Sequence, residues 1–213
     1  DFPASPLARL ATASGRETTF EAVPTRSVLN SPAATHMPFW SVNPYIGCEF
    51  GCTYCYARDT HRWTMERMEG ATVPPLRLPE RGTGGEDDRP ERGTGGEGES
   101  FESRILVKID APAILRRTLD PIRIDGAPIV IGTATDPYQP AERRFRITRG
   151  LLESFLPHRG LHLGIITKSP LITRDTDLLV QLAERHTVSI HISLAALEGR
   201  LVRRIEARSP APH

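Results

Sequence analysis

All three cysteines of the 213-residue chain lie within eight positions, in the segment GCEFGCTYCYAR. Cys48 is followed after three residues by Cys52, and Cys52 is followed after two residues by Cys55. A disulfide would leave one thiol unpaired, and disulfides are typical of small secreted domains rather than of a chain this long. The spacing therefore favours a metal centre.

Two kinds of metal centre are compatible with these residues. A structural zinc site would need a fourth ligand, for which His61 and His36 are candidates, although zinc ligands usually come as two separated pairs. A four-iron cluster usually takes one cysteine for each iron, and this chain has no fourth cysteine. One iron would then be open, which is typical of a catalytic metal. Gly47 and Gly51 permit tight turns and a close approach of the backbone to such a cluster.

Regular secondary structure is expected around this loop and from residue 101 onward. Short apolar segments predict strands at residues 39–42, 104–109, 127–135, 161–167 and 187–195. Amphipathic segments predict helices at residues 111–119, 140–156, 173–185 and 197–207. The alternation of strands and helices predicts parallel βα units in an α/β fold.

The rest of the chain gives weaker signals. We expect residues 1–35 to form an extended lead-in and residues 36–213 to form one domain. The octet PERGTGGE occurs twice in residues 79–100, which are almost free of apolar side chains and are expected to be a disordered insertion.

A net charge of +1 gives no overall attraction to nucleic acid. With no long apolar run and no signal-peptide pattern, we expect a cytoplasmic protein without a membrane partner.

The polar segments that follow the predicted strands are the next candidates for a site. Ligands of parallel α/β folds bind at the carboxyl ends of the strands. TDPYQPAE, TKSP and SLAAL follow three of these strands, and the cysteine loop follows the first. One edge should therefore collect the three thiols with Asp136, Lys168 and Ser193.

The cysteine motif resembles that of the radical S-adenosylmethionine enzymes, C-x3-C-x2-C with an aromatic residue, here Tyr54, before the last cysteine. More narrowly, NPYIGCEFGCTYCYAR, GTATDPYQPAE, TRGLLE, IITKS and RDTDLL are similar to the subgroup related to spore photoproduct lyase, a bacterial DNA-repair enzyme. The resemblance covers residues 41–208 without the insertion. It implies a partial (β/α)6 TIM-like barrel, and because only about five strands can be counted, we expect truncation at the C-terminus.

The resemblance also implies a reaction and its cofactors. A [4Fe-4S] cluster would cleave S-adenosylmethionine reductively and give a 5'-deoxyadenosyl radical. The implied partners are a reductant of the flavodoxin or ferredoxin type and an unidentified substrate. The implied metal ligands are Cys48, Cys52 and Cys55, and the implied S-adenosylmethionine-binding residues are Tyr54, Tyr56, Thr135, Asp136, Lys168 and Ser193.

Four of the implied S-adenosylmethionine contacts have a structural alternative that the sequence leaves open. Lys168, expected at the carboxylate of S-adenosylmethionine, could instead be a strand-end lysine that reaches solvent. Ser193, expected near the ribose or carboxylate, could be a helix N-cap. Thr135 and Asp136, expected near the amino end of the methionine, lie in a segment that favours a turn or a helix cap. Tyr54 and Tyr56 are expected to flank the adenine.

The chain departs from the lyase at one position. Thr133 stands where the lyase has an additional cysteine that donates hydrogen, and no thiol outside the cysteine motif is left for that role. The lyase reaction is therefore only a second hypothesis, with a nucleic-acid substrate, and the substrate itself is unassigned. Arginines that could contact phosphates are Arg143, Arg144, Arg146, Arg200, Arg203, Arg204 and Arg208.

Overall fold

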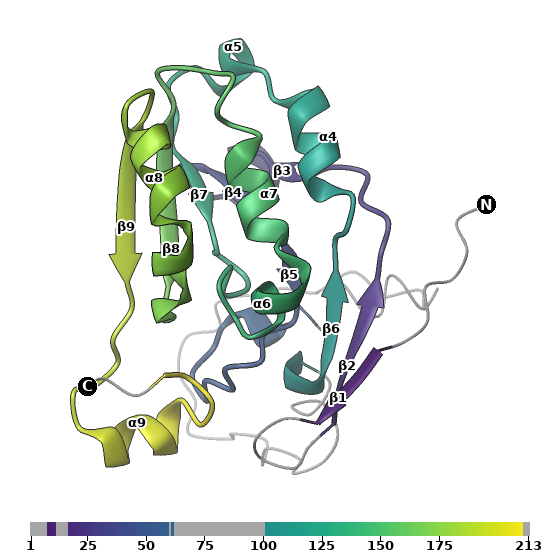
Figure 1. Cartoon of the computed structure of the whole chain (residues 1–213), viewed down its shortest axis with the longest axis vertical. Helices are drawn as coiled ribbons and strands as arrows, with labels where there is room; N and C mark the ends of the chain where they lie inside the picture. Colours follow the sequence, from purple (N-terminus) through teal and green to yellow (C-terminus); the bar gives the residue numbers. More distant parts are fainter. Residues whose placement is uncertain (1–7, 12–16, 60, 62–100, 211–213) are drawn as a thin grey trace, which may run out of the picture.

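The computed structural model of the chain describes residues 8–11, 17–59, 61 and 101–210 (Figure 1). The predicted insertion at residues 79–100 lies outside these residues. The elements, in chain order, are β1 (Ala8–Ala11), β2 (Glu17–Ala22), β3 (Leu29–Asn30), α1 (Pro32–Thr35), β4 (Trp40–Val42), β5 (Tyr45–Ile46), β6 (Arg104–Val107), α4 (Ala111–Thr118), α5 (Pro121–Ile124), β7 (Ile129–Ile131), α6 (Ala141–Phe145), α7 (Ile147–Glu153), β8 (His162–Thr167), the 3-10 helix η1 (Pro170–Asp175), α8 (Thr176–Ala183), β9 (Thr187–Ile192) and α9 (Gly199–Ile205).

The described strands form two sheets. The first has the order β3-β4-β7-β8-β9, in which β4, β7, β8 and β9 run parallel and β3 is antiparallel to β4. The second has the order β1-β2-β6-β5, with one parallel pair between β2 and β6. The predicted α/β class with parallel strand pairs is confirmed. Both sheets are open at their edges, and the described strands do not close into a barrel.

The N-terminal segment contributes to both sheets. Within residues 1–35, β2 pairs with β6, where Phe20 lies opposite Ile105, and β3 pairs with β4, where Leu29 lies opposite Val42. Phe20 is buried in the main core, so this pairing removes apolar surface from water. The described part of the predicted lead-in therefore supplies β1 and β3 at the sheet edges and β2 between β1 and β6.

The core lies between the first sheet and its helices. In Figure 1, α7 packs between α4 and α8 over one face of β7 and β8. Apolar side chains alternate along these two strands, and the inward ones are fully buried, because successive residues of a strand point to opposite faces. Buried side chains that line this interface are Ile114, Leu115, Ile129, Ile131, Leu151, Leu152, Leu163, Ile165, Leu178 and Leu182.

The single helix predicted at residues 140–156 is wrong, because the structure has two helices there. Arg146 takes a left-handed conformation with a φ of 54°, which ends α6 and begins α7. The buried Glu142 carboxylate accepts hydrogen bonds from the backbone amides of Thr148 (2.9 Å) and Arg149 (3.2 Å) in the first turn of α7. These bonds to the new helix offset the cost of about 1–2 kcal/mol for a left-handed residue.

The helix predicted at residues 173–185 is also interrupted. The 3-10 helix η1 occupies the first part of this segment, and α8 begins at Thr176. Ser169 caps η1, since its hydroxyl accepts a hydrogen bond from the amide of Leu171 (3.2 Å), and Pro170 fills the first helical position. The helix therefore begins at a cap and a proline that lie upstream of the apolar pattern.

The four parallel strands of the first sheet end at the same edge, where loops leave toward the cysteine segment. Gly132 follows β7 with a φ of 95°. A Cβ atom there would lie 2.5 Å from the Ile166 carbonyl oxygen and 2.6 Å from Pro137 Cδ. Only glycine lets the chain leave β7 this close to β8.

Candidate functional site

The nine residues predicted as metal ligands or S-adenosylmethionine contacts all line one cavity of about 180 Å³. They come from the cysteine loop after β5, the loop after β7, and the first residues beyond β8 and β9. The prediction that one edge collects the thiols with Asp136, Lys168 and Ser193 is therefore met in space. Thr133 lines the same cavity.

The three thiols are free and differ in exposure. Cys48 and Cys52 are buried, and Cys55 is half-buried. Burial, with a further contribution from Asp136, raises the pKa of Cys48 well above its ordinary value, and burial raises the pKa of Cys52 to about 11 although Lys168 opposes this shift. Thiols with such pKa values are neutral at pH 7, and a metal that binds them must displace their protons.

The donor set suits a cluster in its chemistry, since three free thiols face one cavity. The thiols are not gathered into a coordination shell. Within the described part of the chain, no group of three or more His, Cys, Asp or Glu side chains is arranged to hold a metal ion. The three cysteines therefore fit a cluster in their residue type and in lining one cavity.

Hydrogen bonds from the loop after β7 hold the cysteine loop. The Thr135 hydroxyl donates to the Gly47 carbonyl oxygen (2.6 Å), and Gln139 Oε1 accepts from the Glu49 amide (2.9 Å). The buried Glu49 carboxylate in turn accepts from the Ala141 amide at the start of α6 (2.6 Å). Gly47 and Gly51 have positive φ values of 89° and 67°, as the turns predicted there require. Thr135 is therefore a support of the loop.

Asp136 ties β7 to β8. Its Oδ1 accepts from the Thr167 hydroxyl (2.7 Å) and the Tyr138 amide (2.8 Å), and its Oδ2 accepts from the Lys168 amide (2.7 Å). The bond to Tyr138 is the turn that the sequence allowed as an alternative. Burial raises the pKa of Asp136 although these hydrogen bonds lower it. The carboxylate thus fixes the backbone from which Lys168 projects.

Lys168 is the centre of a polar cluster at the cavity. Its ammonium lies 2.6 Å from Glu206 Oε1, and it donates to the hydroxyls of Ser193 (2.8 Å) and Tyr54 (3.0 Å). Burial lowers the pKa of Lys168, but the bonds to Glu206 and Tyr54 outweigh it and hold the pKa above its ordinary value. The lysine does not extend into open solvent, because its side chain is only 14% exposed.

Glu206 is the residue of this cluster that the sequence did not reveal. The Tyr54 hydroxyl also donates to the Glu206 carboxylate, and the end of α9 pairs with the cysteine loop through the Thr53 amide and the Ile205 carbonyl oxygen (2.8 Å). Glu206 follows no strand and belongs to no quoted motif, so nothing local marks it. Ser193 is not the cap of α9, because Glu198 occupies the N-cap position.

The two tyrosines lie at the cavity with exposed rings. Tyr54 is 54% exposed and Tyr56 is 64% exposed, and the Tyr56 hydroxyl donates to the Thr133 carbonyl oxygen. The histidines proposed as a fourth zinc ligand are elsewhere. Neither His36 nor His61 lines the cysteine cavity, and the His61 ring packs edge-on against Phe101 at 5.2 Å.

Most of the arginines considered for phosphate contact lie on the surface. Helix α6 contains two of them, and a third is the C-cap residue of α6. Helix α9 contains three more. Six of the seven are exposed, and Arg208 is half-buried; the exposed ones are Arg143, Arg144, Arg146, Arg200, Arg203 and Arg204. They form two separate groups, and neither group lines the cysteine cavity.

Comparisons with known proteins find relatives without an assigned activity. The chain is 33% identical over 196 residues to an uncharacterized protein of Mycobacterium tuberculosis, an alignment that covers 91% of this chain and 49% of that protein. It is 27% identical over 170 residues to an uncharacterized protein of Methanocaldococcus jannaschii, covering 80% of this chain and 49% of the other. An uncharacterized protein of Acidianus two-tailed virus is 28% identical over 174 residues, covering 81% of this chain and 48% of the other.

The chain therefore spans about half the length of the curated relatives it matches. No family model matches it. No solved structure matches it either. In the part of the chain that the structure describes, no helix combines the length and apolar character needed to cross a membrane.

Proposed function

We propose that this chain carries the cofactor site of a radical S-adenosylmethionine enzyme. One observation carries the proposal: the nine residues selected by resemblance come from four separate stretches of sequence and line a single cavity. The parallel strands bring these stretches to one edge, and the residues gathered there include three thiols and a lysine. The chain spans about half the length of its relatives, so the activity of a longer protein is also part of the proposal.

In this proposal, Cys48, Cys52 and Cys55 hold three irons of a [4Fe-4S] cluster. When bound, the cluster and S-adenosylmethionine supply one-electron chemistry that yields a 5'-deoxyadenosyl radical. The chain's own contribution is to present the thiols from a loop fixed by Thr135 and Gln139 and to release their protons as metal binds.

Lys168 supplies the cation for the carboxylate of S-adenosylmethionine. An ammonium is a compact partner for that group, and Ser193 adds a hydroxyl beside it. The carboxylate must compete with Glu206, which already neutralises Lys168. Tyr54 and Tyr56 offer exposed aromatic faces to the adenine.

Several finer points belong to the same proposal. The two open sheets would be parts of a partial six-unit barrel, because the order β4-β7-β8-β9 follows the sequence with parallel pairing throughout. A flavodoxin- or ferredoxin-type protein would supply the electron. A cytoplasmic location suits free thiols, which persist in reducing compartments.

Repair of a nucleic-acid lesion is a second candidate, favoured by the exposed arginines Arg200, Arg203 and Arg204 on α9. Binding to DNA that weakens steeply with salt would support it. Equal indifference to DNA at low and high salt would remove it.

The metal content of protein purified without oxygen tests the proposal against a zinc site. We expect about four iron and four sulfide per chain, with broad visible absorbance. Cys55→Ser should lose most of the iron, whereas Thr53→Ser, an exposed change in the same loop, should keep it. Zinc without iron in the parent protein would overturn the proposal.

A further inference from the structure

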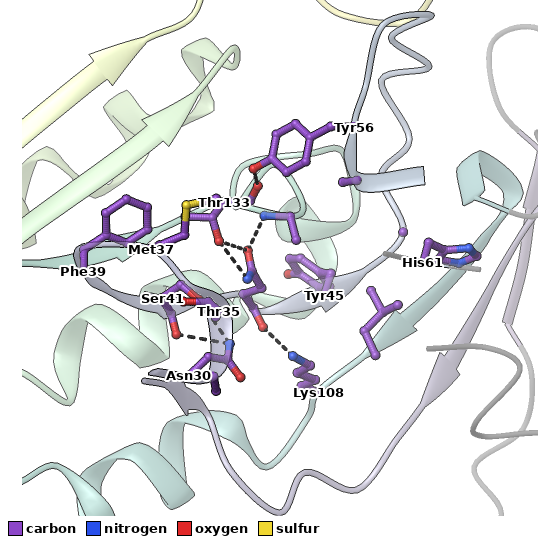
Figure 2. Close-up of a pocket in the computed structure, with 16 residues that line it drawn as sticks. Asn30, Thr35, Met37, Phe39, Ser41, Tyr45, Tyr56, His61, Lys108 and Thr133 are labelled. Carbon is purple, nitrogen blue, oxygen red and sulfur yellow. Dashed lines mark hydrogen bonds between the residues drawn. The ribbon is translucent and has the colours of Figure 1, made fainter. Parts of the chain in front are cut away.

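A second cavity, of about 470 Å³, lies next to the cysteine cavity (Figure 2). The two cavities share the lining residues Tyr56, Ala57, Thr133 and Ala134. Figure 2 shows the Tyr56 hydroxyl bound to the Thr133 carbonyl oxygen at this boundary. A molecule in the second cavity would therefore be separated from the cofactor site by one layer of side chains.

The lining of the second cavity has an unbalanced charge. Among the 16 described residues that line it, Lys108 is the one Lys or Arg, and none is Asp or Glu. Lys108 follows β6 and is half-buried, so its ammonium is held near the cavity by the strand. Such a lining attracts an anion and has no carboxylate to repel one.

The ammonium of Lys108 is incompletely satisfied. It donates one hydrogen bond, to the Asn43 carbonyl oxygen (2.9 Å), and no described Asp or Glu forms an ion pair with it. A lysine has three N–H donors, so two are left for a ligand. Burial lowers the pKa of Lys108 to about 8, as expected for a cation without a counter-ion. It is still charged at pH 7.

Asn43 connects this lysine to the shared boundary. Its side-chain oxygen accepts from the Ala134 amide (2.8 Å), and its side-chain nitrogen donates to the Thr133 hydroxyl (3.1 Å). The backbone carbonyl oxygen of Asn43 accepts the hydrogen bond from the Lys108 ammonium, so one residue contacts both Lys108 and Thr133. The lysine is thus fixed relative to the residues that face the cofactor cavity.

Two further features define what could occupy the cavity. His61 is 4% exposed, and its Nε2 has no hydrogen-bond partner among the described residues, although buried polar atoms are nearly always bonded. Met37 and Phe39 give an apolar part of the lining, and Met37 is 44% exposed at the surface. A ligand with an anionic end for Lys108, a second polar atom for His61 and an apolar body for Met37 and Phe39 matches this lining.

We propose that the second cavity is the substrate site, in which Lys108 binds the carboxylate or phosphate of a small organic anion, His61 contacts another polar atom, and Met37 and Phe39 pack against its apolar part. Its role as a substrate site rests on the proposed function. Its preference for an organic anion rests on the lining alone, so the two can fail separately.

The chain offers a direct probe, because Lys108 and Lys168 are its only lysines. Protein labelled with 13C at the lysine ε-carbons should give two methylene resonances, assigned with Lys108→Arg. Hexanoate, hexyl phosphate and hexanol present the same tail with a carboxylate, a phosphate or no charge. Either anion should shift the Lys108 resonance saturably and raise the pKa of Lys108 by about one unit, while hexanol leaves it unchanged.

The comparison of hexanoate with hexyl phosphate identifies the anionic group that the cavity prefers. Lys108→Gln should weaken binding of the preferred anion at least about tenfold by calorimetry. Arg117→Gln, which removes an exposed charge in α4, should not change it. The resonance of the parent protein answers the question even if the glutamine variant does not fold.

Binding of both anions no stronger than that of hexanol would overturn the inference, as would binding that a folded Lys108→Gln variant retains in full. Formation of 5'-deoxyadenosine by cluster-loaded protein reports separately on the proposed function. Anion binding without 5'-deoxyadenosine would leave an anion site without its radical role. Formation of 5'-deoxyadenosine without anion binding would support the proposed function and refute this anion site.

Discussion

Replacing Glu206 by Gln would break the ion pair at the centre of the candidate site. The Lys168 ammonium and Glu206 carboxylate are 2.6 Å apart, with side chains 14% and 4% exposed. Breaking a buried pair costs about 3–5 kcal/mol, and the partial exposure of Lys168 with its bonds to Ser193 and Tyr54 favours the lower end, about 3 kcal/mol. For a chain of this size that loss lowers Tm by about 6–12 °C.

The same change should affect the binding of S-adenosylmethionine in the opposite sense. Without Glu206, the cosubstrate carboxylate would no longer compete for Lys168, so its affinity should rise in the variant while the unliganded protein is less stable. Thermal unfolding with and without S-adenosylmethionine measures both effects, since a ligand stabilises the state that it binds. Lys168→Gln should lose both the pair and the affinity.

The pH dependence gives a second readout of this pair. Burial raises the pKa of Glu206, but the hydrogen bonds from Lys168, Tyr54 and Ser209 outweigh it and hold the pKa below its ordinary value. A depressed carboxyl pKa means that the stabilisation is full above the unfolded-state pKa of about 4.3 and is lost as pH falls through the lower folded-state value. The difference in Tm between parent and variant should therefore shrink in acid.

Glu198→Gln is the matched control, because Glu198 is an exposed residue at the start of the same helix and makes no side-chain cap bond. It should leave Tm within about 2 °C of the parent, as ordinary surface changes do. An equally small effect of Glu206→Gln at pH 7 would refute the ion pair and the placement of α9 against the cysteine loop.

Three further outcomes test the surroundings of the site. Gly132→Ala should destabilise the chain by more than about 2 kcal/mol in urea unfolding, because its Cβ would meet a backbone oxygen at 2.5 Å, whereas Gly199→Ala has open space and should cost little. Glu142→Gln should lower the free energy of unfolding by about 3 kcal/mol, since Glu142 is fully buried and bound to Arg174 (2.9 Å). Glu153→Gln changes an exposed ion pair and should lower it by under about 1 kcal/mol. Equal losses in the two variants would contradict the buried network around Glu142. In metal-free protein, burial that raises the pKa of Cys52 to about 11 should make its alkylation at pH 8.5 at least about tenfold slower than that of a free thiol, and the rate should rise toward pH 11.

The sequence predicted the four parallel strands of the first sheet, β4, β7, β8 and β9, because each is a short apolar run between turn residues. β7 and β8 bury alternate side chains and lie within the predicted ranges, and the polar residues after them meet at one edge. This part was predictable because parallel strands joined by helices must place their carboxyl ends together.

The features that the sequence did not reveal depend on partners distant in the chain. The break at Arg146 follows from Glu142, whose carboxylate is shared between α7, Arg174 and Tyr45, and helical periodicity carries no trace of such a network. Glu206 acts on Tyr54 across 152 positions. The second cavity is equally hidden, because Lys108 and Asn43 become neighbours only when β5 pairs with β6.

The central claim is that the three thiols and Lys168 serve one reaction, and product formation tests it most directly. The chain, purified and loaded with iron and sulfide without oxygen, should be reduced in the presence of S-adenosylmethionine and assayed for 5'-deoxyadenosine and methionine. We expect both products in the parent and in Thr53→Ser, and neither in Cys52→Ser. A protein with a full complement of iron and sulfide that yields no 5'-deoxyadenosine would contradict the account.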